Sequence, residues 1–470
     1  MTSLSTTSPL DLSAVELADA FGKCRLSPLD LFEELVRRID VVEPRIRSLY
    51  AYDPEGARHA ATLASERWAR GEALGPLDGM PVTIKELIAT KGVPVPLGSA
   101  ATPLVPAERD APAAERLREA GAVIFAKTTC PDIGMLSSGL SSFHPVTRNP
   151  WNLDCNPGGS SSGAAAAAAA GLGPLHVGTD IGGSIRLPAG WCGIVGFKPS
   201  NGRVPIDPYY LGRCAGPMTR TVADAALTMG VLALPDARDA TSLAPEAVDW
   251  MDLDIDLGGL RIGLMLDAGV GLAVEDEILV AVEAAARLLE RHGATIVPVP
   301  GILDRALLDG MDDFWRCRAW VDLEKLPPEA RARMLPYVLA WAGKGAGISG
   351  LRALEGFNGT YEMRRRTAAL FGTVDAVLSP VAPVISFSAE MASPIDDPER
   401  PFEHIAFTLP WNMGEQPAIS INCAWSSSAM PIGLQIVGPR HGDRFTLALA
   451  AAYEGLRGPD RIRPAWTTLD

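Results

Sequence analysis

The chain has 470 residues, with 42 lysines and arginines against 56 aspartates and glutamates, which gives a formal net charge of −14. This acidic balance argues against a nucleic-acid-binding protein, whose footprint would be a basic face. The hydrophobic fraction of 47% is high enough for a large packed core and excludes global disorder. The 46 glycines and 39 prolines favour a sheet with many turns and loops over a helical bundle.

The sequence carries no sign of a membrane span, an export signal or a metal centre. Its most apolar run, residues 164–170, is far shorter than the roughly 20 residues that a bilayer requires. The N-terminus lacks a basic segment followed by an apolar core, so we expect a cytoplasmic protein. The seven cysteines form no C-x-x-C pair and the histidines show no metal-binding spacing, which predicts reduced thiols and no metal.

The predicted elements begin with two helices in the first 45 residues. Ser13 to Glu16 fits a capping box, and Ser27-Pro28 fits an N-cap followed by proline at the first helical position. Strands and helices then alternate: a strand over 82–84, a helix over 113–120, a strand over 122–126, a loop over 129–157, a helix over 164–170 and a strand over 175–179.

The pattern changes from about residue 227 and returns to alternating strands and helices in the last 100 residues. The middle section predicts a strand over 260–264, a helix over 274–291, a strand over 294–299 and charged helices over 304–370. The end predicts strands over 376–378, 418–421 and 432–437 and a helix over 445–456. With no internal repeat, one α/β unit with a less regular middle is the simplest organisation.

Three patterns suggest chemistry that their surroundings do not support. Residues 159–163 match the G-x-S-x-G nucleophile elbow, but a loop precedes them where the motif needs a strand, and neither His404 nor His441 lies in a supporting motif. The same loop precedes a helix N-terminus, which favours anions, but no nucleotide-binding glycine pattern is present. A cysteine nucleophile at Cys130 or Cys192 has no histidine nearby in a known signature.

A fourth pattern joins three segments into one hydrolytic site. Lys85 ends an apolar strand, residues 158–163 form a loop rich in hydroxyls, and Ser184 follows two glycines after the strand over 175–179. Such a turn can direct successive backbone N–H groups at one point, as an oxyanion hole requires. A serine nucleophile needs a base, and burial lowers the pKa of a lysine so that it can be neutral at the working pH.

At these residues the sequence resembles the amidase signature family of serine hydrolases, which use a Ser–Ser–Lys triad instead of Ser–His–Asp. The resemblance covers nearly the whole chain and is strongest over 157–205, which begins PGGSSSGAAAAAAAG. It implies that Ser184 is the nucleophile, that Ser160, after a cis peptide bond, is the relay, and that Lys85 is the general base. It also implies an oxyanion hole made by the backbone N–H groups of Ile181, Gly182, Gly183 and Ser184. The implied substrate-binding residues are Gly134, Met135, Ser137 and Cys130.

Two departures from the family pattern accompany the match. The second half of the serine loop reads Ser162-Gly163-Ala164 where the family usually has Gly-Gly-Ser, without loss of a triad member. His176 stands where the family usually has a small or apolar residue, and we expect a satisfied histidine at a strand end. Asp180 and Arg186 match the motif and are expected to tie the loop together without touching substrate.

The resemblance implies an α/β fold, a single large α/β/α sandwich with a mixed central sheet surrounded by helices. It predicts one domain over 1–470, divided into N-terminal helices at 10–45, a signature core at about 75–225, a variable helical section at about 230–370 and an α/β return at about 371–470. No cofactor is implied.

The expected function is hydrolysis of a C–N amide bond through an acyl-enzyme, on small aliphatic or aryl amides. The alternatives are an aryl ester or carbamate (urethane) hydrolase on the same triad, and the glutaminase subunit of a tRNA-dependent amidotransferase. The expected partners are a small amide substrate and, by family habit, a second copy of the chain, with no nucleic acid and no membrane. A non-catalytic binding protein on this fold is disfavoured because all three triad positions are present.

Overall fold

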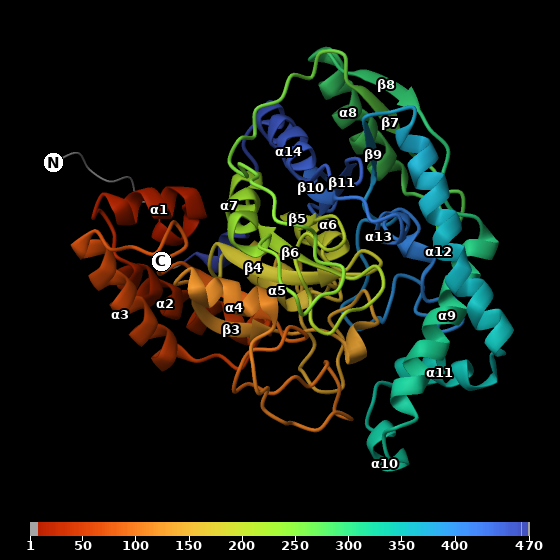
Figure 1. Cartoon of the computed structure of the whole chain (residues 1–470), viewed down its shortest axis with the longest axis horizontal. Helices are drawn as coiled ribbons and strands as arrows, with labels where there is room; N and C mark the ends of the chain where they lie inside the picture. Colours follow the sequence, from red (N-terminus) through yellow and green to blue (C-terminus); the bar gives the residue numbers. More distant parts are fainter. Residues whose placement is uncertain (1–7, 462, 469–470) are drawn as a thin grey trace.

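One mixed sheet of 11 strands runs through the computed structural model, which describes residues 8–461 and 463–468 (Figure 1). In sheet order the strands are β1 (Leu49–Tyr50), β3 (Val123–Thr128), β2 (Pro81–Lys85), β4 (Leu175–Asp180), β6 (Cys214–Thr219), β5 (Val195–Lys198), β10 (Ala418–Trp425), β11 (Pro431–Val437), β9 (Ala376–Pro380), β7 (Arg261–Leu264) and β8 (Thr295–Pro298). The predicted α/β fold class, a large mixed sheet surrounded by helices, is confirmed.

Strand direction decides where the site forms. β2 runs parallel to both β3 and β4, whereas the strands from β4 to β9 pair antiparallel in the order β4, β6, β5, β10, β11 and β9. Because parallel strands end at the same edge of a sheet, the carboxyl ends of β2 and β4 lie side by side. Lys85 and Asp180 are the last residues of these two strands.

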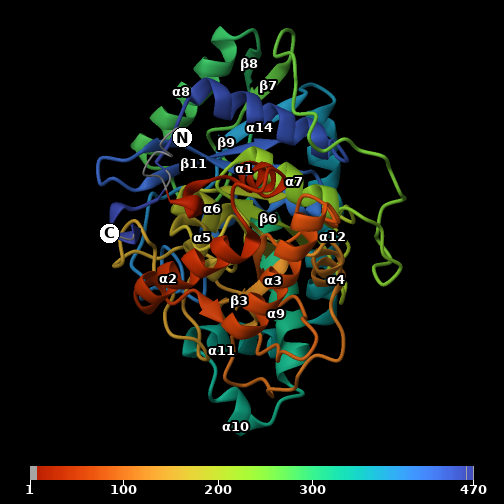
Figure 2. The same cartoon turned by 90° about the vertical axis from the view of Figure 1, so that its left-hand side faces the viewer.

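Helices cover both faces of the sheet. They are α1 (Ala14–Gly22), α2 (Pro28–Ile46), α3 (Pro54–Arg70), α4 (Pro112–Glu119), α5 (Ser162–Ala169), α6 (Arg186–Cys192), α7 (Val222–Leu232), α8 (Asp276–Arg291), α9 (Arg305–Leu323), α10 (Pro328–Arg331), α11 (Pro336–Gly343), α12 (Gly350–Phe371), α13 (Pro410–Met413) and α14 (Asp443–Arg457). α4, α7, α14 and α8 contact one another in series, and α5 contacts α6. Figure 2 shows α2 and α3 in front of β3, and Figure 1 shows α9, α11 and α12 at the opposite end.

The sequence signals at the first helices are confirmed. The Ser13 hydroxyl accepts the N–H of Glu16, and the Glu16 carboxylate accepts the N–H of Ser13 at 2.8 Å, which completes the capping box. The Ser27 hydroxyl caps α2 by accepting the N–H of Asp30, and Pro28 is the first residue of this helix. The alanines of α5 are all buried, because their small side chains let the helix lie close against the strands and α6.

Seven elements had no predicted counterpart, namely β1, α3, α6, β5, β6, α7 and α13. The buried positions of α3 are the alanines Ala57, Ala61 and Ala64, which give a weak hydrophobic stripe. β5 and β6 contain glycine, and β6 also contains proline, residues that are depleted in strands. Tertiary pairing in the middle of the sheet outweighs these local preferences.

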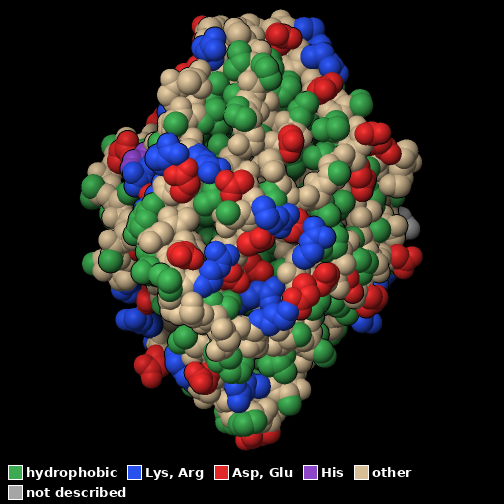
Figure 3. Space-filling model, turned by 90° about the vertical axis from the view of Figure 1, so that its right-hand side faces the viewer, with side chains coloured by type: hydrophobic (Ala, Val, Ile, Leu, Met, Phe, Trp, Pro, Cys, Tyr) green, Lys and Arg blue, Asp and Glu red, His purple; other side chains and the backbone are tan. Residues whose placement is uncertain are grey.

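The section over 304–370 is helical, as predicted, and its charges are mixed. Figure 3 shows acidic, basic and hydrophobic side chains interspersed over the face where α9 and α12 lie. The basic run on α12 is paired, since Arg364 contacts Glu415 at 2.5 Å and Arg366 contacts Asp304 at 2.9 Å. Among the described residues, no helix is both long and apolar enough to cross a membrane.

Candidate active site

The Lys85 ammonium lies at the end of β2, completely buried, among three hydroxyl groups. Its Nζ donates to Ser160 Oγ at 2.8 Å, Thr179 Oγ1 at 3.0 Å and Ser161 Oγ at 3.1 Å. These three bonds use all the donors of an ammonium group. Burial lowers the pKa of Lys85 from 10.5 to about 8, because the charged form loses its water. A neutral amine is therefore accessible at mildly alkaline pH.

The two serines beside Lys85 differ in what their own hydroxyls can do. Ser161 Oγ donates to the carbonyl of Thr179 at 3.1 Å and accepts the N–H of Thr179 at 3.2 Å. Ser160 Oγ has Lys85 as its partner and no second hydrogen bond within the described residues. The proton of Ser161 is thus held by a carbonyl, whereas that of Ser160 is free to move.

The backbone around Ser160 has little freedom. The Gly159–Ser160 peptide is cis, as the resemblance implied. A side chain at position 159 would lie 2.6 Å from the backbone nitrogen of Ser138, so only glycine fits there. Gly158 has a φ of +79°, a conformation that glycine adopts without strain. Two glycines are therefore required directly before the serine.

Ser184 lies in the turn between β4 and α6, half-buried, and its carbonyl accepts the N–H of Ser161 at 3.2 Å. The N–H groups of Ile181, Gly182 and Ser184 have no acceptor among the residues that the structure describes. The N–H of Gly183 differs, because it donates to Asp180 Oδ1 at 2.9 Å. Three of the four predicted oxyanion donors are thus unoccupied, and the fourth holds the loop.

A buried ion pair fixes the turn that carries Ser184. Arg186 contacts Asp180 through Nε at 3.0 Å and Nη2 at 2.9 Å, and both side chains are completely buried. The charge of Arg186 keeps the pKa of Asp180 well below its usual range despite burial. Asn412 donates to Asp180, and the Arg186 guanidinium also donates to Asn412 and Gln435, each at 2.6 Å. Asp180 and Arg186 therefore hold the loop in place, as expected, and their partners come from distant segments of the chain.

Two groups of residues lie beside the serines and form walls of the site. The sequence analysis identified one of these walls, the loop that contains Gly134. Gly134 is close to Ser160, because a methyl group at this position would lie 3.6 Å from Ser160 Oγ. Met135 is half-buried and Ser137 is buried in the same loop. The other wall was missed: at Gly182 a methyl group would lie 3.1 Å from Ile405 and 3.3 Å from Trp315.

The aromatic wall has no local sequence signal. Trp315 comes from α9, and its ring packs against Phe402 with 5.0 Å between centroids. Trp315 Nε1 is buried and has no hydrogen-bond partner within the described residues. Only the fold brings these side chains to the turn over 181–184, so spacing along the chain could not have revealed them.

Cys130, which the resemblance implies to be a substrate-binding residue, lies in a polar environment. Its side chain is buried, its thiol lies 3.2 Å from Glu86 Oε1, and it is close enough to Lys85 to affect the pKa of that amine. Burial and the Glu86 carboxylate raise the pKa of the thiol well above its usual value. Glu86 also contacts His144 Nε2. Cys130 is thus part of a buried polar cluster beneath the site.

Within residues 8–461 and 463–468, no histidine ring bonds a serine hydroxyl. His176 is buried in β4, where Nδ1 lies 2.7 Å from Thr83 Oγ1 and Nε2 lies 3.2 Å from the carbonyl of Gly173. His404 is buried without a partner at either ring nitrogen in the described part of the chain, and burial lowers its pKa to about 3. Ser161, the central serine of the G-x-S-x-G match, contacts Lys85 and Thr179, so the nucleophile-elbow interpretation has no support.

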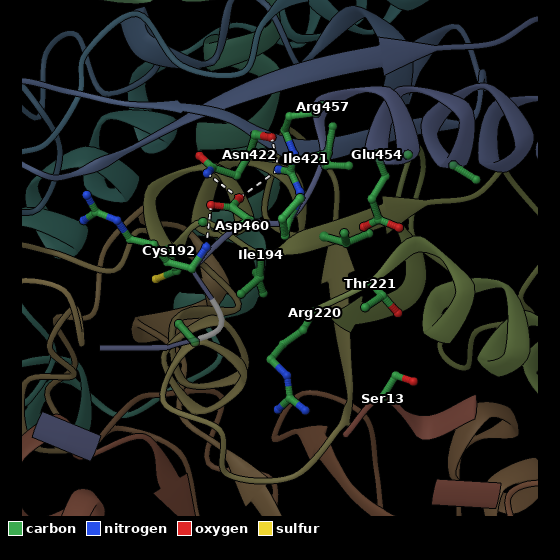
Figure 4. Close-up of a pocket in the computed structure, with 18 of the residues that line it drawn as sticks. Ser13, Cys192, Ile194, Arg220, Thr221, Ile421, Asn422, Glu454, Arg457 and Asp460 are labelled. Carbon is green, nitrogen blue, oxygen red and sulfur yellow. Dashed lines mark hydrogen bonds and ion pairs between the residues drawn. The ribbon is translucent and has the colours of Figure 1, made fainter. Parts of the chain in front are cut away.

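The cavity in Figure 4, of about 620 Å³, lies away from these groups. Its lining includes Arg220, Glu454 and Asp460. Arg220 directly follows β6, Glu454 lies on α14, and Asp460 belongs to the segment after α14. The Arg220 guanidinium donates to the carbonyls of Leu10 and Leu12, which fastens the N-terminal segment to the sheet. None of the residues around Lys85 lines this cavity.

Comparison with known proteins gives a consistent result. The family model described as Amidase matches residues 30–447. The chain belongs to the amidase family. It is 35% identical to a glutamyl-tRNA(Gln) amidotransferase subunit of Chloroflexus aggregans over 97% of this chain and 99% of that protein. It is 32% identical to an acylamidase of Rhodococcus erythropolis over 97% of each chain.

The solved structures agree. A bacterial aryl acylamidase of the amidase signature family superimposes with a TM-score of 0.86 at 29% identity, covering 96% of this chain and 97% of that one. The protein is accordingly an amidase signature enzyme, a hydrolase of carbon–nitrogen bonds other than peptide bonds.

Proposed function

We propose that the protein hydrolyses small aliphatic or aryl amides through an acyl-enzyme on Ser184, with Ser160 as relay and Lys85 as base. The observation that carries the proposal is the contact of the buried Lys85 amine with Ser160 Oγ at 2.8 Å. A buried lysine with a lowered pKa beside a hydroxyl that has a free proton is the arrangement a general base needs.

The first half of the reaction forms the acyl-enzyme. Neutral Lys85 takes the proton of Ser160, and Ser160 takes the proton of Ser184 as its oxygen attacks the amide carbon. The N–H groups of Ile181, Gly182 and Ser184 stabilise the negative charge on the carbonyl oxygen. We leave Gly183 out of this hole, because its N–H is bound to Asp180. The C–N bond then breaks, and the amine leaves with the proton returned through Ser160.

The second half releases the acid. Water replaces the amine, gives its proton to Ser160 and Lys85, and attacks the ester carbon of acylated Ser184. The same backbone donors stabilise the second oxyanion, and Ser184 regains its proton as the acid leaves. The ion pair of Asp180 and Arg186 holds the donors in place through both halves.

The substrate class follows from the walls around the serines. Met135, Ile181 and Trp315 offer apolar and aromatic surface beside the turn of Ser184. An aryl or alkyl group on either side of the amide is therefore favoured. The same acyl-enzyme chemistry allows aryl esters and carbamates, which we keep as the second candidate because their leaving groups are better.

The glutaminase alternative rests on the similarity to glutamyl-tRNA(Gln) amidotransferase subunits. It would require a partner protein to receive ammonia. We favour a stand-alone amidase, because an acylamidase is similar over 97% of the chain as well. We also infer that the protein resides in a reducing compartment such as the cytoplasm, since all seven cysteines are free. We further infer that it assembles as a homodimer.

The test is an acyl-transfer panel with wild type, Ser184→Ala and the control Ser427→Ala, an exposed serine far along the chain. The panel contains a short aliphatic amide, an anilide, glutamine, a nitrophenyl ester and an aryl carbamate. We expect turnover of the anilide and loss of about 10³-fold or more in Ser184→Ala, with Ser427→Ala unchanged. Equal turnover by Ser184→Ala would disprove the assignment, and glutamine as the best substrate would favour the glutaminase.

A further inference from the structure

Two arginines beside the Ser184 turn lack the carboxylate partners that other arginines near the site have. Arg186 pairs with Asp180, Arg316 with Asp312 and Arg364 with Glu415. Among the described residues, neither Arg213 nor Arg318 forms an ion pair. In a chain with 56 acidic and 42 basic residues, unpaired arginines close to a catalytic centre need an explanation.

Both arginines contact the ring of Tyr210. The guanidinium carbon of Arg318 lies 3.2 Å from the ring centroid and that of Arg213 lies 5.5 Å from it. A guanidinium stacked on an aromatic ring keeps its N–H donors in its own plane, around the edge of the ring. These contacts hold two cations beside one ring and leave most of their donors available. One donor of Arg213 is used by the carbonyl of Pro208.

The position of Arg213 relative to the oxyanion loop is fixed by the sheet. Cys214 in β6 pairs with Asp180, the last residue of β4, and Arg213 directly precedes Cys214. The next residue after Asp180 is Ile181, the first of the proposed donors. Consistent with this placement, the charge of Arg213 is close enough to lower the pKa of Lys85.

Arg318 approaches from the other side, on α9. Trp315, one turn earlier on the same helix, lies against Gly182 of the loop. Figure 1 shows α9 on the side of the molecule toward which the turn after β4 points. The contact of Arg318 with Tyr210 therefore brings the loop between β5 and β6 against α9 beside the reacting centre.

Two carboxylates whose charges act on this cluster have partners of their own. Asp322, whose charge acts on Tyr210, pairs with Lys325 at 3.0 Å. Asp239, whose charge acts on Arg213, accepts the N–H groups of Ile206 at 2.9 Å and Thr241 at 2.8 Å. The protein itself thus supplies no anion for the two arginines within the part of the chain that the structure describes.

We propose that Arg213 and Arg318, stacked on Tyr210, bind a carboxylate of the substrate, so that the preferred amides are aryl or alkyl amides that carry a carboxylate group. The planar fork of a guanidinium matches a carboxylate with two parallel hydrogen bonds. This inference rests on the proposed function. In it, the apolar walls bind the aryl or alkyl part of the substrate and the two arginines bind its carboxylate.

The test compares pairs of amides that differ in one carboxylate. Glutaryl-4-nitroanilide is paired with pentanoyl-4-nitroanilide, and 4-acetamidobenzoate with acetanilide, so that the charge lies on the acyl or on the amine side. We expect kcat/KM of wild type to favour the carboxylate member of one pair by about tenfold or more. Ratios near one in both pairs would overturn the proposal.

The variants assign the preference to the two arginines. We expect Arg213→Gln and Arg318→Gln each to lower the ratio about tenfold, and Arg213→Lys to lower it less, because it keeps the charge but not the fork. The control Arg352→Gln, an arginine paired with Asp313 at 2.6 Å, should keep the wild-type ratio. A wild-type ratio in both glutamine variants would disprove the site.

A binding measurement separates this site from the chemistry. Calorimetry with Ser184→Ala and uncleaved glutaryl-4-nitroanilide should give binding that weakens about tenfold when Arg318→Gln is added. Equal affinity with and without Arg318 would contradict the proposal. If wild type turns over neither the charged nor the neutral anilides, the proposed function itself fails and the carboxylate site falls with it. Turnover of both members at equal rates would remove only the carboxylate site.

Discussion

Two buried lysines lie next to each other in the sheet and differ in what surrounds them. Lys85 ends β2, and Lys127 in β3 is the register partner of Ile84. Burial lowers the pKa of both from 10.5 to about 8. Lys85 faces three hydroxyls, whereas the Lys127 amine donates to the carbonyl of Ile88. A carbonyl has no proton to give, so a lowered pKa identifies a candidate base and the neighbouring group decides whether it can act.

The largest difference should be that between the methionine variants of the two lysines. Lys85→Met removes the proposed base, and we expect kcat/KM for an anilide to fall about 10³-fold or more. Lys127→Met removes an amine of equal burial without a hydroxyl neighbour, and we expect a loss below about tenfold. Steady-state kinetics on folded protein, checked by circular dichroism, measure both. Equal losses would show that the two lysines share one catalytic role.

The two serine hydroxyls beside Lys85 should also differ in their effect on activity. Ser160→Ala removes the hydroxyl whose proton is free, and we expect a loss of about 10²–10³-fold in kcat. Ser161→Ala removes a hydroxyl that is bonded to Thr179, and we expect about tenfold, through positioning alone. Burst kinetics with a nitrophenyl ester report acylation directly. If Ser161→Ala has the greater effect, the relay assignment is reversed.

The sequence accounts for the local parts of this site and not for the distant ones. Ser184 and Ser160 follow glycine pairs that a tight backbone requires, and Lys85 ends a run of strand-forming residues, so each has a local signal. Lys127 is the last residue but one of a strand of this kind, and nothing near it in the chain distinguishes it from Lys85. Only the pairing of β2 with β4 places hydroxyls beside one lysine and not the other.

The same limit applies to the groups that hold and line the site. Asn412 and Gln435 reach Arg186 from more than 200 residues away, and Trp315 reaches Gly182 from the middle helices. Helices and strands with caps or periodic apolar residues were predicted, whereas β5 and β6 were missed because glycine and proline weaken their pattern. Contacts of high sequence separation arise from the sheet order, which a single sequence does not display.

In stability, unlike in activity, the two lysines should behave alike. Each pKa is lower in the folded state than the ordinary value of 10.5, so the unfolded chain binds more protons between about pH 8 and 10.5. Stability from each lysine therefore rises with pH in this window, by about 3 kcal/mol, and is constant below it. Urea unfolding of wild type against Lys85→Met and Lys127→Met should show this difference for both variants. A pH-independent difference for either would contradict burial as the cause.

The smallest effect should come from Glu86, whose buried carboxylate raises the pKa of both lysines. The Glu86 charge has the second largest effect on the pKa of Lys127, after burial. Its effect on the pKa of Lys85 is smaller than those of burial, Cys130, Asp180 and Arg213. We therefore expect Glu86→Gln, which keeps the shape, to lower the pKa of Lys127 more than that of Lys85. The proposed mechanism requires neutral Lys85, so kcat/KM of wild type should rise with pH to a plateau above about 8. In Glu86→Gln this rise should occur at slightly lower pH.

The two shifts can be measured together, because the chain has only seven lysines. Lysine labelled with ¹³C at Cε gives one titrating signal for each, and Lys85→Met and Lys127→Met assign the two buried ones. The Lys85 signal should titrate at the pH where the activity limb lies, while the Lys127 signal moves further in Glu86→Gln. If the activity limb instead follows Lys127, the base is not the lysine beside the hydroxyls, and the distinction drawn from their neighbours is wrong.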